Sequence, residues 1–335
     1  MLTFTLRRLM LAIPTLLLIS LIIFLLVDFA PGSPMSEIPL TVPPEVRLKM
    51  IKALGADEPV LVRYVLWLRQ FFLVEPAYLF DSYFGTTLAG DEQRILSWQS
   101  RAPVFTVIGQ RIPQTLTVIG TAYLVGITIA LPIGIYSAYR QYSLFDQFGT
   151  LFAMIGFSVP TFFTGTMFII IFAVWLGWFP TKYDTTLVVT DWASFLKQIK
   201  QMAMPVMVLG LANAAAISRY MRSSMLENMG QDYVRTARAK GMTERVVVLK
   251  HVLRNSLIPV VTVIALGIPS IFGGAIITEN LFGVNGIGSA LIGAINANDL
   301  PMVQTLAFIF AALIVTFNLI ADVLYGLLDP RIRYE

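Results

Sequence analysis

The sequence predicts an all-α, polytopic membrane protein with about six transmembrane helices. Of its 335 residues, 56% are hydrophobic and only 13% are charged, whereas a soluble domain of this size carries roughly a quarter charged residues. The apolar residues gather in long uncharged runs, and the basic residues gather between alternate runs. A chain this apolar requires a bilayer, whose core accepts runs of roughly 20 apolar residues as helices.

Six uncharged runs mark the predicted spans. They are Leu9–Val27, Thr115–Tyr139, Gln147–Thr181, Gln201–Ser218, Asn255–Thr278 and Leu300–Ala321. Each is long enough, or nearly so, to cross about 30 Å of hydrocarbon at about 1.5 Å per residue. The third run is too long for one span and contains Pro160, which predicts a kink there or a short non-spanning helix before the span.

The positions of lysine and arginine predict the orientation, because short cytoplasmic loops are enriched in both. Basic residues occur at both chain ends, in the second short loop and, most densely, in the loop after the fourth run: Arg7, Arg8, Arg140, Arg222, Arg235, Arg238, Lys240, Arg245, Lys250, Arg254, Arg331 and Arg333. With six spans these segments share one side, so we expect both termini to be cytoplasmic. The loop from Lys182 to Lys200 has three basic residues and is a mild exception.

The same pattern predicts three parts. Residues 1–30 form the N-terminus and first transmembrane helix. Residues 31–111 form an extracytoplasmic segment with short helices, for which Val46–Leu54 and Leu61–Phe72 have the apolar spacing. Residues 112–335 form a core of five transmembrane helices with a cytoplasmic loop at 222–254.

The second run contains a stripe of small residues. Ala122, Gly126, Ala130, Gly134 and Ala138 recur every four residues and therefore share one face of a helix. In a bilayer such a stripe lets another helix approach closely. We therefore expect this face to pack against another helix.

Residue types needed for several chemistries are missing. The sequence has no cysteine, and His251 is its only histidine, which excludes disulfides, thiolate metal sites and zinc sites with two or more histidines. No Gly-Lys-Ser/Thr step is present, so no P-loop is expected. The glycine-rich run Gly283–Gly288 has the wrong order for a dinucleotide fingerprint, and we interpret it as a turn. The net charge of +4 is no sign of nucleic-acid binding in a membrane protein. We expect no catalytic site, cofactor or metal.

Two other classes of membrane protein make expectations that the sequence does not meet. A membrane enzyme, such as a lipid-modifying transferase, would need a polar cluster at one interface. A channel or self-sufficient secondary transporter would show inverted repeats or charges at mid-membrane, where a charge costs about 2.5–3.5 kcal/mol on insertion scales. Both alternatives stay open at this point.

The loop after the fourth run has an unusual construction. Asp232–Lys240 is predicted to be a short helix with Asp232 near its start, Gly241 to end it in the left-handed conformation, and Thr243 to cap a second helix, Glu244–Leu253. The second helix is unexpectedly apolar for a cytoplasmic loop, which suggests either a docking partner or packing on the spans; its apolar residues are Val246, Val247, Val248, Leu249, Val252 and Leu253.

These residues resemble a known family. The stretch Tyr233–Gly241, followed by Leu249–Pro259, resembles the cytoplasmic "EAA" loop of membrane subunits of bacterial ABC importers, in particular the dipeptide, oligopeptide and nickel branch. Three further stretches of the sequence resemble this branch. They are Leu6–Arg8 followed by Ala30–Pro34, Thr278–Phe282 followed by Gly286–Gly288, and Asn318–Arg333. The N-terminal pattern is similar to the first of the two membrane subunits. Arg235 stands where the general motif begins with Glu, as is usual in this branch.

The resemblance implies the type I importer transmembrane fold, a location in the bacterial inner membrane and a passive pathway for peptides. Its expected partners are a second homologous membrane subunit, two cytoplasmic ATPases, an extracytoplasmic substrate-binding protein and the lipid bilayer. Close relatives of the branch carry nickel, opines or oligosaccharides, which remain alternatives. The pathway residues cannot be named from the sequence.

The resemblance also implies which residues couple the chain to the ATPases. They belong to the segment 231–254 and are Tyr233, Arg235, Thr236, Ala237, Arg238, Lys240, Gly241 and Thr243. We expect Ala237 to permit close approach and Gly241 to set the angle between the two helices. The arginines and Lys240 are expected to make contacts at the rim.

Overall fold

The computed structural model describes residues 2–30, 58–90, 92–273 and 276–328. These residues form helices and connecting loops, and their only β pairing is an isolated bridge between Leu96 and Pro103. The all-α prediction is confirmed. The predicted helix Val46–Leu54 lies outside the described residues.

The chain divides into two compact units. Unit 1 comprises residues 1–10, 114–289 and 313–335, and unit 2 comprises residues 11–113 and 290–312. The division at 113/114 lies close to the boundary predicted at 111/112. The sequence gives no sign, however, that unit 2 also includes most of the first helix and the residues from 290 to 312.

Five helices are long and apolar enough to cross a membrane: Thr5–Asp28, Val104–Tyr139, Trp192–Met229, Glu244–Pro269 and Leu300–Leu324. A sixth candidate is the pair α7 (Leu144–Ser158) and α8 with its π-helical continuation (Thr161–Trp175), which meet at an angle of 103°. The break contains Pro160, whose ring cannot continue the preceding helix. The kink predicted at Pro160 is therefore present, and it is sharp enough to leave two 15-residue halves.

Unit 1 is built around two helices that pack along their length. They are α6 (Thr121–Tyr139), reached from α5 (Val104–Thr115) through a π-helical turn, and α9 (Trp192–Met229). All five residues of the small stripe are buried. A Cβ on Gly126 would lie 2.9 Å from the carbonyl oxygen of Gly210, and one on Gly134 would lie 2.7 Å from that of Ser218. The missing side chains thus let the two backbones approach.

One long helix replaces two predicted elements. α11 (Glu244–Val246), a π-helical segment (Val247–Val252) and α12 (Leu253–Gly273) follow one another without a gap. The prediction of a separate cytoplasmic helix before the span is wrong, since no glycine or proline occurs between Glu244 and Ile258 to end it. Thr278, predicted at the end of this span, lies instead in α13 (Ile276–Phe282), which Gly283 follows at φ +71°.

Unit 2 contains one continuous helical rod outside the long spans. α3 (Val60–Arg69) passes through a π-helical turn into α4 (Glu75–Phe84), which ends at Gly85 with φ +67°. The observed helical run, Val60–Phe84, is thus longer than the predicted helix Leu61–Phe72. The unit's other helical parts come from α1 (Leu2–Asp28), α5 as far as Pro113, α14 (Ile287–Asn296) and α15 (Leu300–Leu328).

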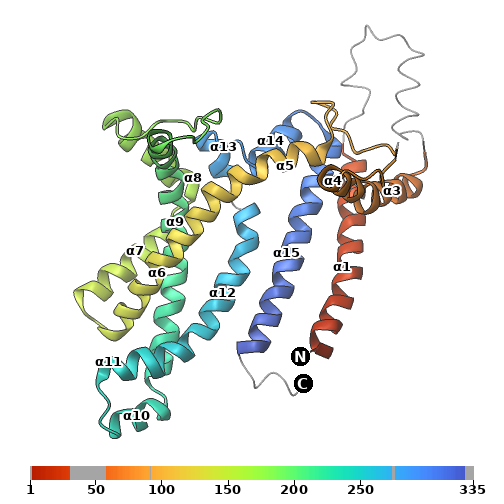
Figure 1. Ribbon diagram of the computed structural model, residues 1–335. Coiled ribbons are helices and arrows are strands. Elements are labelled where there is room, and N and C mark those ends of the chain that lie inside the picture. The colour runs from red at the N-terminus through yellow and green to blue at the C-terminus, as the bar shows by residue number, and fades with distance from the viewer. Residues whose placement is uncertain (1, 31–57, 91, 274–275, 329–335) are drawn as a thin grey trace. The chain divides into compact units, whose positions relative to one another are not determined.

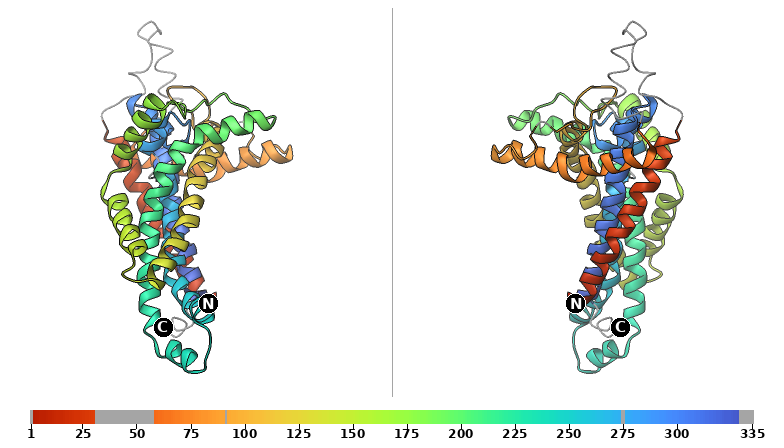
Figure 2. Two further views of the ribbon diagram at one scale, coloured as in Figure 1. Left: turned by 90° about the vertical axis from the view of Figure 1, so that its left-hand side faces the viewer. Right: turned by 90° about the vertical axis from the view of Figure 1, so that its right-hand side faces the viewer.

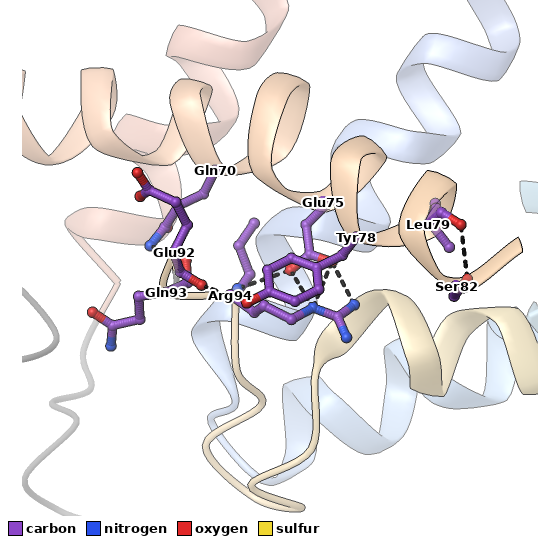
Figure 3. A network of polar contacts seen from close by, with 9 residues as sticks. Gln70, Glu75, Tyr78, Leu79, Ser82, Glu92, Gln93 and Arg94 are labelled. Carbon is purple, nitrogen blue, oxygen red and sulfur yellow. Dashed lines mark hydrogen bonds and ion pairs between the residues drawn. The ribbon is translucent and has the colours of Figure 1, made fainter. Parts of the chain in front are cut away.

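Aromatic rings and buried acids hold unit 2 together. Trp67 packs edge-on against Phe308 of α15 with ring centroids 5.4 Å apart. Figure 3 shows the fully buried Glu75, which forms an ion pair of 2.6 Å with Arg94. The guanidinium of Arg94 lies over the Tyr78 ring. Another buried acid, Asp299, accepts a 2.5 Å hydrogen bond from the Ser97 hydroxyl. Burying a carboxylate is costly unless it is paired or hydrogen-bonded; Glu75 has an ion pair, and Asp299 has hydrogen bonds from Ser97 and from backbone N–H groups.

Candidate functional site

The helix–glycine–helix segment lies at one end of α9 and α12 (Figure 1). α10 (Asp232–Ala239) begins after Gln231, which takes the extended N-cap conformation, so Asp232 is the first helical residue rather than the cap. An acidic side chain in the first turn faces the positive end of the helix dipole and is favourable there. Thr243 occupies the N-cap position of α11, although its side chain makes no capping hydrogen bond.

The inner face of α10 packs on the chain itself. Val234 and Ala237, three residues apart, are buried in one apolar cluster with Val247, Val248 and Val252. The same cluster includes Met221 and Met225 of α9. The sequence left open whether the apolar residues of the second helix contact a docking partner or the spans. For Val247, Val248 and Val252, the contact is with the chain's own helices. The small size of Ala237 fits a close contact within the chain.

The outer face of the segment is solvent-facing. Apart from Ala237, the residues predicted to couple the chain to the ATPases are exposed: Tyr233, Arg235, Thr236, Arg238, Lys240, Gly241 and Thr243. Val246 and Leu249 are also exposed, at 43% and 50%. A polar and basic surface with two apolar side chains beside it is thus presented away from the cluster.

Gly241 sets the corner between the two helices. Its φ of +75° lies in the left-handed region, and a Cβ built there would meet nothing within 4 Å. Any penalty for a side chain at this position therefore comes from the backbone conformation, because the surroundings offer room. Across the corner, Arg238 Nη2 donates to Glu244 Oε1 at 2.6 Å. The hydrogen bonds to this carboxylate raise the pKa of Arg238 above its usual value.

Hydrogen bonds join α9 to α12 beside the segment, and one bond joins α10 to α9. Ser224 Oγ donates to the carbonyl oxygen of Ser256 at 2.9 Å, and Ser256 Oγ returns a bond to that of Ser224 at 3.2 Å. Both serines are buried. The Tyr233 hydroxyl donates to Asn228 Oδ1 at 2.7 Å. The end of α9 is thus bonded both to α10 and to α12.

A buried ion pair joins α7 to α9 in the same unit. Asp146 is 3% exposed and accepts two hydrogen bonds from Arg222, at 2.6 Å to Nε and 2.8 Å to Nη2. A two-pronged arginine–carboxylate contact fixes distance and angle together. Arg222, predicted as one of the loop's solvated basic residues, is instead part of α9 and of this contact.

Glu279 is a buried acid whose role the sequence does not reveal. It directly follows the predicted span Asn255–Thr278, yet it is fully buried in α13. Its carboxylate accepts hydrogen bonds from Thr115 Oγ1 at 2.7 Å and from the Ser289 backbone at 2.9 Å. A Cβ on Gly286 would overlap this carboxylate. The glycine-rich run is thus a turn, as predicted, and it makes room for Glu279.

The described residues contain no group of three or more histidine, cysteine, aspartate or glutamate side chains that could hold a metal ion. Long apolar helices with a folded, polar-faced segment at the end of two of them define a polytopic membrane protein.

Comparison with known proteins gives the family. The sequence model of the family described as "Binding-protein-dependent transport system inner membrane component" matches residues 130–334. The model of the N-terminal part of such components matches residues 1–119. The chain belongs to this family of inner-membrane transport components. The resemblance found in the sequence is confirmed, and so is a multi-pass location in the inner membrane.

Three relatives match over the full length of both chains. The oligopeptide transport system permease protein AppB of Bacillus subtilis is 36% identical to this chain over 338 residues. The di/tripeptide transport system permease protein DppB of Pseudomonas aeruginosa is 35% identical over 353 residues. The dipeptide transport system permease protein DppB of Escherichia coli K12 is 34% identical over 357 residues. In each case the match covers 100% of this chain and 100% of the relative.

Proposed function

We propose that this chain is the transmembrane pathway subunit of an ATP-driven importer for di- and oligopeptides. Its membership of the family places it among membrane transport components. The relatives that match it over their full length are named for oligopeptide, di/tripeptide and dipeptide transport. The number of residues in the transported peptide differs among those names, so the proposal covers the class of peptides and no particular length.

The energy would come from other subunits. The sequence has no P-loop, so ATP binding and hydrolysis are assigned to two cytoplasmic ABC ATPases. A second homologous membrane subunit would complete the pathway, and an extracytoplasmic binding protein would deliver the peptide. With both termini cytoplasmic, the segment 231–254 lies on the side of the ATPases.

The observation that supports coupling through this segment is its two-faced construction. Val234 and Ala237 fix α10 to the ends of α9 and α12, while the residues between them are exposed. A partner that moved the outer face would therefore move two long helices as rigid bodies. ATP bound on the partner would bias the transition, as a ligand that prefers one of two states does.

The test is a series at Gly241. Gly241→Val should abolish transport, because a β-branched residue at φ +75° is strained by about 1–3 kcal/mol and would shift the corner. Gly241→Asn is the matched control, since asparagine tolerates the left-handed region. It should retain most transport. Transport and retention of the ATPases are measured in the same membranes, after membrane levels of each variant have been equalised.

Two further substitutions separate shape from charge. Ala237→Glu should abolish transport, because it places a charge in a buried apolar cluster. Arg238→Ala should be mild, since its ion pair with Glu244 is exposed and such pairs contribute about 0–1 kcal/mol. Normal transport by Gly241→Val would contradict the coupling role. So would loss of Gly241→Val through degradation alone while Gly241→Asn is stable and transports.

A further inference from the structure

The first nine residues of α9 project from unit 1. Most residues from Trp192 to Lys200 are exposed, whereas Gln201 and Met202 are 7% and 8% exposed. Figure 2 shows this green start of α9 extending sideways from the remainder of the helix. Pro205 follows within α9 and removes a backbone hydrogen bond there. The helix can therefore change direction where it enters the body of the unit.

The projecting segment is amphipathic. Trp192, Phe195, Leu196 and Ile199 follow the spacing i, i+3, i+4, i+7, so they share one face of the helix. Their exposed fractions are 71%, 41%, 48% and 49%. Lys197 and Lys200 lie off this face. Four large apolar side chains on an exposed stripe are far more than the single exposed residues that need no explanation.

Polar contacts fix the orientation of the stripe. Gln201 Oε1 accepts from the Asp184 backbone at 2.9 Å, and Gln201 Nε2 donates to Gln198 Oε1 at 2.7 Å. Gln198 in turn donates to the Tyr183 hydroxyl. Because the glutamines occupy the other side of the helix and are held by the preceding loop, the apolar stripe is left facing away from it.

The loop before α9 extends the apolar surface. Val188 and Val189 are 72% and 48% exposed. A shallow, open groove lies beside Trp192 and Phe195, whose rings are 5.4 Å apart; Val189, Thr190 and Asp191 line it as well. The stripe and the groove together form a surface that we call the α9 apolar face: Val188, Val189, Trp192, Phe195, Leu196 and Ile199.

The length of the segment favours the lipid surface as its partner. The predicted span Gln201–Ser218 follows directly on the same helix, within the 38 residues Trp192–Met229 that are long and apolar enough to cross a membrane. Nine residues before it span about 14 Å, whereas the interfacial layer on each side of the hydrocarbon is only about 5–8 Å thick. A segment of that length must either stand out into water or lie along the interface. With an apolar face it is more stable along the interface than in water.

We propose that Val188–Lys200 is a lipid-binding interfacial element, with its apolar face in the outer leaflet at the boundary between headgroups and acyl chains. Trp192 would lie at headgroup level, as tryptophan does in membrane interfaces. Lys197 and Lys200 would reach anionic phosphates with their side-chain ends, their apolar stems remaining along the surface. The choice of the outer leaflet rests on the proposed orientation, but lipid binding itself does not.

Spin labels test the proposal, because the chain contains no native cysteine. Single cysteines replace Leu196 or Ile199 on the apolar face and Lys197 on the polar side as the matched control. The full chain, purified with its associated subunits, is reconstituted in vesicles of phosphatidylethanolamine and phosphatidylglycerol. Collision of each label with oxygen, which concentrates in lipid, is compared with collision with a water-soluble nickel chelate.

The proposal expects the Leu196→Cys and Ile199→Cys labels to collide several-fold more with oxygen than with nickel, and the Lys197→Cys label to show the reverse. Nickel access to all three would overturn it, since the stripe would then lie in water. Shielding of the two apolar positions from both reagents would also overturn it, because a protein would then cover the face. None of these measurements needs transport, so failure of the importer proposal would leave them interpretable.

Discussion

Gly134 shows how one absent side chain sets the distance between two helices. A Cβ there would lie 2.6 Å from Met221 Cβ and 2.7 Å from the carbonyl oxygen of Ser218. The second contact is to backbone, which cannot rotate away. The packing of α6 on α9 therefore depends on this glycine more than on any favourable contact it makes.

Gly134→Leu should destabilise the protein by about 1–3 kcal/mol, the usual cost of overpacking. The measurement is the loss of folded protein on heating in detergent. Gly120→Leu serves as the control, because a Cβ at Gly120 meets nothing within 4 Å. Equal melting of the two variants would show that α6 and α9 are not held at this distance.

Residues that meet across long stretches of sequence were the least predictable. The small stripe could be read from the sequence because its five members lie on one helix. The network of Glu279, Thr115 and Gly286 could not, since 164 residues separate Thr115 from Glu279. No spacing rule connects such positions. Gly286 and Gly288 follow Glu279 closely in the sequence, but their role in making room for its side chain is visible only once the turn between α13 and α14 is known.

At the scale of elements, Asp191 defines where α9 begins. Its carboxylate accepts a 2.7 Å hydrogen bond from the Ser194 backbone, and the Ser194 hydroxyl reciprocates with the backbone of Asp191, completing a capping box. The Ser194 hydroxyl and backbone together lower the pKa of Asp191 below its usual value. The ionised form is thus the one that caps.

The start of α9 should therefore loosen in acid. A group with a depressed pKa contributes stability above its unfolded value and loses it as the pH falls through the folded value. The mobility of a spin label at Ala193 should rise only as the pH falls below Asp191's usual value of 3.8. Asp191→Asn, which keeps a capping oxygen, should remove this pH dependence, and Asp191→Ala should give high mobility throughout. A pH-independent label in the unsubstituted chain would contradict the capping role.

Element boundaries failed where charge was taken as a helix end. Lys250 and Arg254 suggested a break between a loop helix and a span, but charged residues are good helix formers. The helix consequently runs from Glu244 through α12. By contrast, the helix ends predicted at Gly241 and Pro160 are present, because each of these residues acts through its own backbone conformation.

At the scale of the whole molecule, the orientation remains a prediction that labelling can test. Single cysteines at Thr87 and Thr243, both exposed, should react with a membrane-impermeant maleimide from opposite sides. Thr87 is expected to react in intact cells, and Thr243 only after the membrane is opened. Gln141→Cys gives a second cytoplasmic position without removing Ser143, the cap of α7. Reaction at Thr243 in intact cells would rule out the proposed topology.

The number of spans and the class of protein were predictable because both depend on composition and on long runs. The membership of unit 2 was not. In its core Trp67 packs against Phe308. Its buried Asp299 accepts a hydrogen bond from Ser97, which lies about 200 residues earlier in the chain. Hydrophobic runs show which residues enter the membrane, but they do not show which helices become neighbours.

The two faces of α10 imply two separate rates of evolution within one eight-residue helix. Val234 and Ala237 are constrained by this chain's own α9 and α12, so they should stay the same in any relative with the same helix packing. Arg235 and Thr236 of α10, and Lys240 directly after it, are exposed, so under the proposed coupling they would change with the partner subunit. If the proposed coupling holds, gene duplication followed by substitution of three exposed residues would redirect such a protein to another ATPase, while its membrane core stayed unchanged.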